Sequence, residues 1–248
     1  MSRFFFWVFL WTGSMLQLCG FEITNAEADF IAAKIYQNEC SSKTKRLVWW
    51  NEGEEFASLG IGHFIWYPEG KRGLFEETFP SLIAYFSERK VKLPDWLQAK
   101  TPCPWKSKED FLKENAQKNE LLALLLETIP LQAAFLAKRF EEIAPRLSEY
   151  EERIARVASS KQGKYALLDY ANFKGSGLVA SESYHGQGWG LKQVLETMAD
   201  DRNDPVAAFA LAAQTVLEKR VQNAPEERNE KRWLPGWTSR VKSYCLSK

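Results

Sequence analysis

The chain has 248 residues, of which 45% are hydrophobic, and its formal net charge at pH 7 is +1. This length and apolar content suffice for one large globular domain or two small ones. The near-neutral charge argues against a nucleic-acid-binding face, and against a strongly cationic antibacterial protein that is steered to anionic cell walls. With only two His and no Cys-x-x-Cys pair, the sequence predicts no zinc site, and we expect no metal or other cofactor.

Residues 1–20 begin with a positive charge at Arg3, which is followed by a short apolar run. This pattern is typical of a secretory signal peptide, and an uncleaved N-terminal anchor is the alternative. The sequence Leu16-Gln17-Leu18-Cys19 also resembles a bacterial lipoprotein signal, in which Cys19 would be lipidated. All three interpretations predict a periplasmic or cell-envelope protein with a folded domain over residues 21–248. The uncleaved anchor and the lipidated Cys19 would also tether it to a membrane.

A helix is predicted to follow, with Thr24 or Asn25 as its N-cap. Its apolar stripe recurs at three- and four-residue spacing and consists of Ala28, Ile31, Ala32 and Ile35. Glu39 falls at the edge of this stripe, near the helix C-terminus. Burial and the negative end of the helix dipole would both favour a protonated carboxyl, which a general acid requires. The alternative is an ordinary solvent-exposed glutamate.

A hairpin is predicted next. Residues 58–63 (SLGIGH) alternate small and apolar side chains, and Gly60 and Gly62 allow another backbone or a substrate to approach closely. An acidic, Gly-containing turn over residues 51–55 precedes them. A buried acid on a helix that faces a second carboxylate is the arrangement that glycosidic cleavage needs.

These residues resemble the phage-type lysozymes, whose signature is a Glu at the end of the first helix, an Asp in a hairpin turn, and Thr-(Ile/Val)-Gly-(Ile/Tyr)-Gly-His. Glu39 matches the general acid, and Ser58 stands where the family has Thr. The family spacing, counted back from Ser58, puts Glu52 at the Asp position. The resemblance implies that Glu52 and Ser58 hold the attacking water or stabilise the transition state, and that His63 pairs with an acidic side chain for stability.

The chain departs from the family pattern in three ways. Cys40 follows Glu39 where the family has Gly, the gap from Glu39 to the hairpin is a few residues longer, and the second acid is Glu. Asn51, Glu54 and Glu55 are alternatives for this second position. The resemblance therefore supports the general-acid role of Glu39 more directly than the water-holding or stabilising role of Glu52.

The segment around residues 64–110 is interpreted as an insertion that could form one wall of a substrate cleft. We expect a helix over Phe79–Arg89 and a turn into a short helix at Leu93–Leu97. A disulfide between Cys40 and Cys103 would tether the active-site helix to a Pro-rich loop, and two free buried thiols are the alternative.

The remaining chain predicts a helical body. A helix that is apolar nearly all round, Tyr165–Lys174, resembles the core helix of the phage-type family, and its Asp169 and Asn172 must find polar partners. The Pro-led tail also resembles the family at Pro225, Arg228, Arg232, Gly236 and Trp237. The other expected helices are Phe111–Glu127, Pro130–Tyr150, Ile154–Ala158 and Pro205–Val221, with a further helix that begins at Pro225.

A Gly-rich loop lies between these helices, and its Tyr184, Gln187 and Trp189 are candidate substrate-binding residues because aromatic rings stack on sugars. Residues 188–193 also resemble the Gly-Leu-Met-Gln strand of lytic transglycosylases and goose-type lysozymes, for which Glu182 would be the acid. The spacing from Glu182 is too short for a helix followed by a hairpin, so Glu39 ranks above it. A plain helix-to-helix loop is the alternative.

The sequence thus predicts an α+β, mainly helical lysozyme-like fold with a small β-hairpin lobe. The expected function is a muramidase-like hydrolase of peptidoglycan glycan strands, which acts as a monomer on β-1,4 bonds through Glu39. Two alternatives remain open: a lytic transglycosylase, which needs one Glu, and a non-catalytic wall-binding protein with a degenerate cleft.

Overall fold

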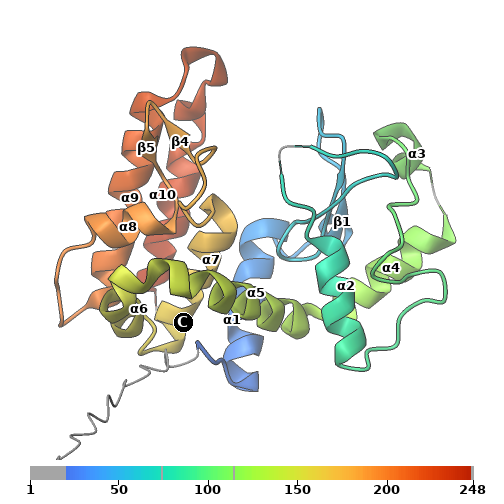
Figure 1. Cartoon of the computed structure of the whole chain (residues 1–248), viewed down its shortest axis with the longest axis horizontal. Helices are drawn as coiled ribbons and strands as arrows, with labels where there is room; N and C mark the ends of the chain where they lie inside the picture. The colour runs from blue at the N-terminus through green and yellow to red at the C-terminus, as the bar shows by residue number, and fades with distance from the viewer. Residues whose placement is uncertain (1–20, 74, 114, 247–248) are drawn as a thin grey trace, which may run out of the picture.

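The computed structural model describes residues 21–246 except 74 and 114, so the expected signal or anchor and Cys19 lie outside the described residues. Two lobes lie on either side of a central pair of helices, α1 (Asn25–Cys40) and α5 (Ile129–Ile143) (Figure 1). We call residues 44–128 the hairpin lobe and residues 144–246 the C-terminal lobe. About 60% of the chain is helical and the sheet is small, which confirms the mainly helical α+β class.

Helix α1 begins where the sequence predicted. The Thr24 hydroxyl accepts from the Glu27 amide, and the Glu27 carboxylate accepts from the Thr24 amide, so the two residues form a capping box. The predicted apolar stripe is buried and packs on α5 and on α7 (Lys161–Lys174). The helix ends at Cys40, where Ser41 adopts a left-handed conformation, so Glu39 is the second-last helical residue.

The hairpin lobe contains a three-stranded antiparallel sheet in the order β1 (Val48–Trp49), β2 (Ala57–Leu59), β3 (Phe64–Trp66). Ser58 is opposite Trp49 on one side and Ile65 on the other. The 3-10 turn η1 (Thr44–Leu47) precedes the sheet, and α2 (Phe79–Glu88), α3 (Lys108–Leu112) and α4 (Ala116–Glu127) surround it.

Two predictions in this lobe are wrong. Residues 93–97 form a turn without a helix. The predicted helix Phe111–Glu127 is wrong as one element: α3 ends at Leu112 and α4 begins at Ala116, where the Asn115 side chain accepts from the Lys118 amide as an N-cap. The segment around Trp66 is nevertheless well packed, since the buried ring of Trp66 contacts those of Phe79, Trp96 and Trp105.

The C-terminal lobe is built around α7, the predicted core helix, which Ser160 caps through the Gly163 amide. Gly163 therefore lies in the first turn of this helix. The lobe's elements are η2 (Ala144–Tyr150), α6 (Glu151–Val157), α7, β4 (Ser183–Tyr184), β5 (Gln187–Gly188), α8 (Leu191–Thr197), α9 (Pro205–Asn223), η3 (Glu226–Arg228), η4 (Glu230–Arg232), α10 (Leu234–Lys242) and η5 (Ser243–Cys245).

The chain after α9 differs from the prediction. Pro225 is followed by two short 3-10 turns, and the last α-helix, α10, begins at Leu234 with Pro235 in its first turn. The Gly-rich loop holds the small antiparallel pair β4–β5.

Gln132 on α5 joins the central helices to the hairpin. Its side chain is fully buried, accepts from the Ile61 amide at 2.9 Å and donates to the Leu125 carbonyl at 2.6 Å. A buried amide with both ends satisfied fixes the hairpin turn against α4 and α5.

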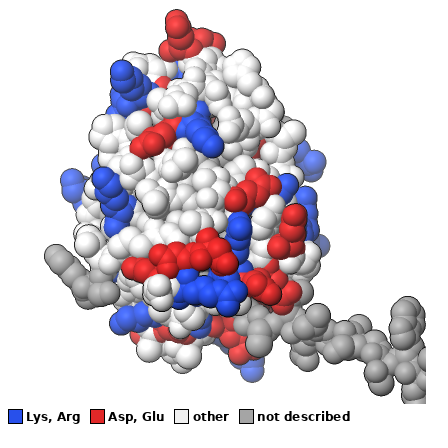
Figure 2. All heavy atoms as spheres, turned by 90° about the vertical axis from the view of Figure 1, so that its left-hand side faces the viewer, with Lys and Arg blue, Asp and Glu red and all other residues white. Residues whose placement is uncertain are grey.

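Cys40 and Cys103 are free, buried thiols, so the alternative to the disulfide holds. Burial raises the pKa of each thiol to about 12. No single helix among residues 21–246 passes as a membrane span by length and hydropathy; only the bent pair α4 with residues 129–157 does so. Figure 2 shows acidic and basic side chains interspersed on the outer end of the C-terminal lobe, without a large area of one sign.

Candidate active site

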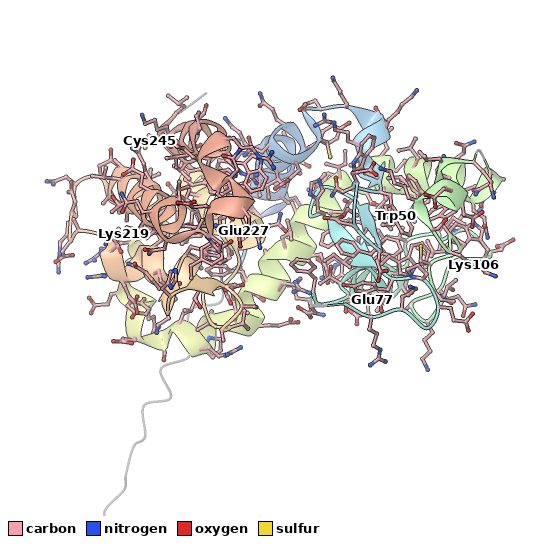
Figure 3. All side chains as sticks on the ribbon, turned by 90° about the horizontal axis from the view of Figure 1, so that it is seen from above. Trp50, Glu77, Lys106, Lys219, Glu227 and Cys245 are labelled. Atoms are coloured by element: carbon pink, nitrogen blue, oxygen red, sulfur yellow. The ribbon has the colours of Figure 1, made fainter. Side chains whose placement is uncertain are left out.

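Glu39 lies between the two lobes and contacts one residue from each. Its Oε1 accepts from Arg240 Nη2 of α10 at 2.5 Å, and its Oε2 lies 3.5 Å from His63 Nδ1 in the β2–β3 turn. The Glu39 side chain is 11% exposed. Figure 3 shows the two lobes from above: Trp50, Glu77 and Lys106 mark the hairpin lobe, and Lys219, Glu227 and Cys245 mark the C-terminal lobe.

Asp169 of α7 provides the other half of the Arg240 site. Its two oxygens each accept from the guanidinium at 2.8 Å, a bidentate pair, and Oδ2 also accepts from the Tyr244 hydroxyl at 2.6 Å. Asn38, beside Glu39 on α1, donates to Asp169 at 3.2 Å and to the Tyr165 hydroxyl at 2.7 Å. The expectation that Asp169 finds a polar partner is confirmed, and the partner is structural.

The neighbouring charges keep Arg240 and Tyr244 protonated although both are buried. Burial alone would lower the pKa of Arg240, but Asp169 and then Glu39 raise it well above its ordinary value. Burial, together with the Asp169 charge, raises the pKa of Tyr244 well above its ordinary value. Arg240 is therefore always a cation, and two carboxylates share it.

Glu52 is not among the groups that contact Glu39. Its side chain is 93% exposed, and its carboxylate pairs with Lys108 of α3. In a mechanism that inverts the anomeric centre, about 6.5–9.5 Å would separate the two acids, so direct contact is not required. Its catalytic role stays a prediction.

Ser58 is buried at 4% exposure in the middle strand β2. Its neighbours Ala57 and Leu59 are fully buried in the core, and alternation along a strand directs Ser58 to the opposite face. Its role as a water-holding residue stays a prediction as well.

Gly60 and Gly62 accommodate the protein's own side chains. Gly60 has a φ of +66°, and a Cβ there would collide with the Gln132 amide oxygen. A Cβ at Gly62 would collide with the Phe64 ring. The close approach to these glycines that the sequence indicated therefore exists, but the groups that make it are the Gln132 and Phe64 side chains of this chain.

Trp189 is buried at 7% exposure, which leaves little of it free to stack on a sugar, and its substrate-binding role stays a prediction. The Tyr184 ring lies 4.5 Å from the Trp189 ring, and the Arg220 guanidinium lies 4.0 Å from the centroid of the Trp189 ring. The Tyr184 hydroxyl donates to the buried Glu230 at 2.8 Å. The Gln187 side chain is exposed and accepts from Asn223 at 2.7 Å. Tyr184 and Trp189 thus form part of a folded network around Glu230.

The buried Glu230 at the centre of this network is balanced by two arginines. Burial would raise the pKa of Glu230, but the hydrogen bonds from Arg220 and Tyr184 hold it below its ordinary value. Arg220 donates to both Glu230 oxygens at 2.8 Å, and Arg228 lies 3.6 Å away. Of the tail residues that resemble the family, Arg228 belongs to this structural cluster.

Glu182, the acid of the transglycosylase alternative, is held by the Gly-rich loop. Its carboxylate accepts from the Gly177 amide, and burial raises its pKa while the loop amides of Gly177, Ser176 and Leu178 oppose this. A Cβ at Gly175 would collide with the carboxylate, so the glycine there makes room for it. These contacts indicate that Glu182 stabilises the conformation of the Gly-rich loop.

Two concavities lie away from Glu39. One of about 480 Å³ is lined by the loops after β3 and before α3, including Glu69, Lys71 and Lys100. The other, of about 330 Å³, lies beside Gln187 and Lys219 on the C-terminal lobe. Within residues 21–246, apart from 74 and 114, no group of three or more His, Cys, Asp and Glu side chains is placed to hold a metal ion.

Sequence reasoning missed Arg240 and Lys174. Arg240 lies 201 positions after Glu39, so no local pattern links them. The available signal was the spacing of Trp237, Arg240 and Tyr244 near the C-terminal end: they are three and four residues apart, as residues on one face of a helix would be.

No family model, curated protein or solved structure matches this chain.

Proposed function

We propose that this protein hydrolyses the glycan strands of peptidoglycan, cleaving β-1,4 bonds by general acid catalysis through Glu39. The observation that carries the proposal is the position of Glu39. A carboxyl group that is 11% exposed, at a helix end, meets the glycine-containing β2–β3 turn of one lobe and the last helix of the other.

The proposed mechanism gives each group a separate task. Glu39 protonates the oxygen of the leaving sugar. Before the substrate binds, Arg240 and His63 hold its two oxygens in place, and Asp169 fixes the guanidinium of Arg240. Glu52, or a neighbouring acid of residues 51–55, with Ser58 orients the attacking water.

A lytic transglycosylase is the second candidate, and a specific observation favours it. This reaction needs one acid, and the second acid expected here is 93% exposed and engaged by Lys108. The sugar's own C6 hydroxyl then replaces water as the nucleophile that attacks C1 and gives its proton to Glu39, which is by then a carboxylate, so the product has a 1,6-anhydro end.

The test is mass spectrometry of fragments released from purified peptidoglycan by the full-length protein, compared with Glu39→Gln. The matched control is Glu142→Gln, an exposed glutamate in the last turn of α5. We expect reducing-end muropeptides from the wild type and the control, and none from Glu39→Gln.

The other outcomes are equally informative. Anhydro ends that depend on Glu39 but not on Glu52 would favour the transglycosylase. Undiminished release by Glu39→Gln would refute the catalytic assignment, and no release by any variant would refute hydrolysis of this polymer.

A further inference from the structure

Lys174 is a buried lysine that the proposed mechanism does not use. It is the last residue of α7 and is 8% exposed. Its Nζ lies 3.3 Å from the centroid of the Trp237 ring and 4.0 Å from that of Phe173. In the part of the chain that the structure describes, no oxygen is placed to accept a hydrogen bond from it. Nζ is not among the fully enclosed side-chain nitrogens without a partner, so it keeps access to the surface and an incoming ligand can reach it.

The charged groups around Lys174 come from four elements: Arg220 on α9, Arg240 on α10, Glu230 on η4 and Glu39 on α1. Both carboxylates are already engaged, Glu230 by Arg220 and Glu39 by Arg240. Among the residues that the structure describes, no carboxylate contact therefore offsets a charge on the Lys174 amine. Burial, and then the two arginines, lower the pKa of its amine to about 6.

The surroundings of the amine suit a sugar. Phe173 and Trp237 are half-buried, and Trp233, 39% exposed, lies 5.9 Å from Trp237. On α10, Trp237 and Arg240 follow Trp233 by four and seven residues, so the three lie along one face. This row runs from an exposed indole to the guanidinium that contacts Glu39, and aromatic faces with a nearby charge are typical of carbohydrate contacts.

We propose that Lys174, between the rings of Phe173 and Trp237, binds a carboxylate carried by a sugar of the substrate, beside Glu39. This inference rests on the proposed function and specifies its substrate class: a glycan whose sugar carries a carboxylate, as N-acetylmuramic acid does, in preference to a neutral one such as chitin. The ligand supplies the acceptor that the amine lacks, and the amine is protonated in the complex.

The experiment measures binding, so it does not depend on cleavage. The probes are N-acetylglucosaminyl-N-acetylmuramic acid and N,N′-diacetylchitobiose, which differ by the lactyl carboxylate. Their dissociation constants for the full-length protein are measured by calorimetry near pH 6, with mass spectrometry to verify that both disaccharides stay intact. The variants are Lys174→Met and Lys174→Gln, and the control is Lys242→Met, an exposed lysine of α10.

We expect the wild type and the control to bind the carboxylated disaccharide about ten- to a hundredfold more tightly, the range for one charge-assisted contact. Both Lys174 variants should lose this preference, and in the wild type it should shrink at pH 8. Equal binding of the two probes by the wild type, or a preference that survives both Lys174 substitutions, would overturn the inference. A preference that depends on Lys174, in a protein that releases no peptidoglycan fragments, would instead count against the proposed function alone.

Discussion

Asp169→Asn is the substitution that tests the interior of the site most directly. Asp169 is fully buried and holds Arg240 through two hydrogen bonds of 2.8 Å, with a third from Tyr244 at 2.6 Å. An asparagine has the same shape but removes the charge and turns one acceptor into a donor that faces other donors. Losing one partner of a buried ion pair costs about 3–5 kcal/mol. Because Glu39 still contacts Arg240, we expect a loss at the lower end, about 3 kcal/mol.

Urea unfolding of the wild type and the variant measures this loss. The matched control is Asp200→Asn, whose carboxylate pairs with Arg156 at 2.7 Å but is 60% exposed. Exposed pairs contribute about 0–1 kcal/mol, so the control should unfold near the wild-type midpoint. If Asp169→Asn were no more destabilising than this control, the buried cluster would not have the energetics argued here.

A double-mutant cycle with Glu39→Gln sharpens the test. Glu39→Gln alone should change stability by less than about 1 kcal/mol, because Asp169 retains the guanidinium. In the Asp169→Asn background the same change leaves Arg240 without a carboxylate. The double variant should therefore lose about 1–3 kcal/mol more than the sum of the single changes. Additive losses would mean that the two carboxylates do not share Arg240.

Three further predictions concern other parts of the molecule. Lys174→Met should remove a pH dependence of stability. The pKa of the Lys174 amine is about 6 in the folded protein, below its value in the unfolded chain, so the wild type gains roughly 1.4 kcal/mol of stability per pH unit between these two pKa values. Urea unfolding at pH 7 and pH 9 should show this gain in the wild type and not in Lys174→Met. Gly60→Ala should cost about 1–3 kcal/mol in the same assay because of the left-handed φ and the collision with a buried amide, whereas Gly53→Ala, also at positive φ but with open space around it, should cost less. Iodoacetamide at pH 8, followed by peptide mapping, should label the exposed Cys245 in the folded protein and spare the buried Cys40; equal labelling of both would contradict the packing described here.

The elements that the sequence predicted well are those with local signals. The N-cap at Thr24, the apolar stripe of α1 and the glycines of the β2–β3 turn are each encoded within a few residues. The position of Glu39 at the end of its helix followed from the same local pattern. Errors arose where a local signal was ambiguous: Pro225 suits both a helix start and a loop, and the following turns are held by Glu230, whose partners Tyr184 and Arg220 belong to other elements.

The contacts of the candidate site could not be predicted in the same way. Asp169 was expected to find a partner, but not which one, because Arg240 lies 71 residues later in the chain. Trp189 was a reasonable stacking residue by composition, and only the packing of Tyr184 and Arg220 against its ring shows that it is buried. Residue type suggested possible roles for Asp169 and Trp189. Their burial and their contact partners bear on which role each has, and both depend on tertiary packing.

The arrangement around Arg240 connects stability to the proposed chemistry. A general acid must deliver a proton, so Glu39 cannot remain in a permanent ion pair with Arg240. In the proposed mechanism Asp169 would resolve this conflict, because its two hydrogen bonds would keep the guanidinium in place while Glu39 leaves it for the substrate. Asp169→Asn would then leave Arg240 to Glu39 alone and reduce the rate of cleavage by more than its loss of stability explains. Activity measured well below the unfolding midpoint of the variant separates these two effects: a rate equal to that of the wild type would show that Asp169 only supports the fold.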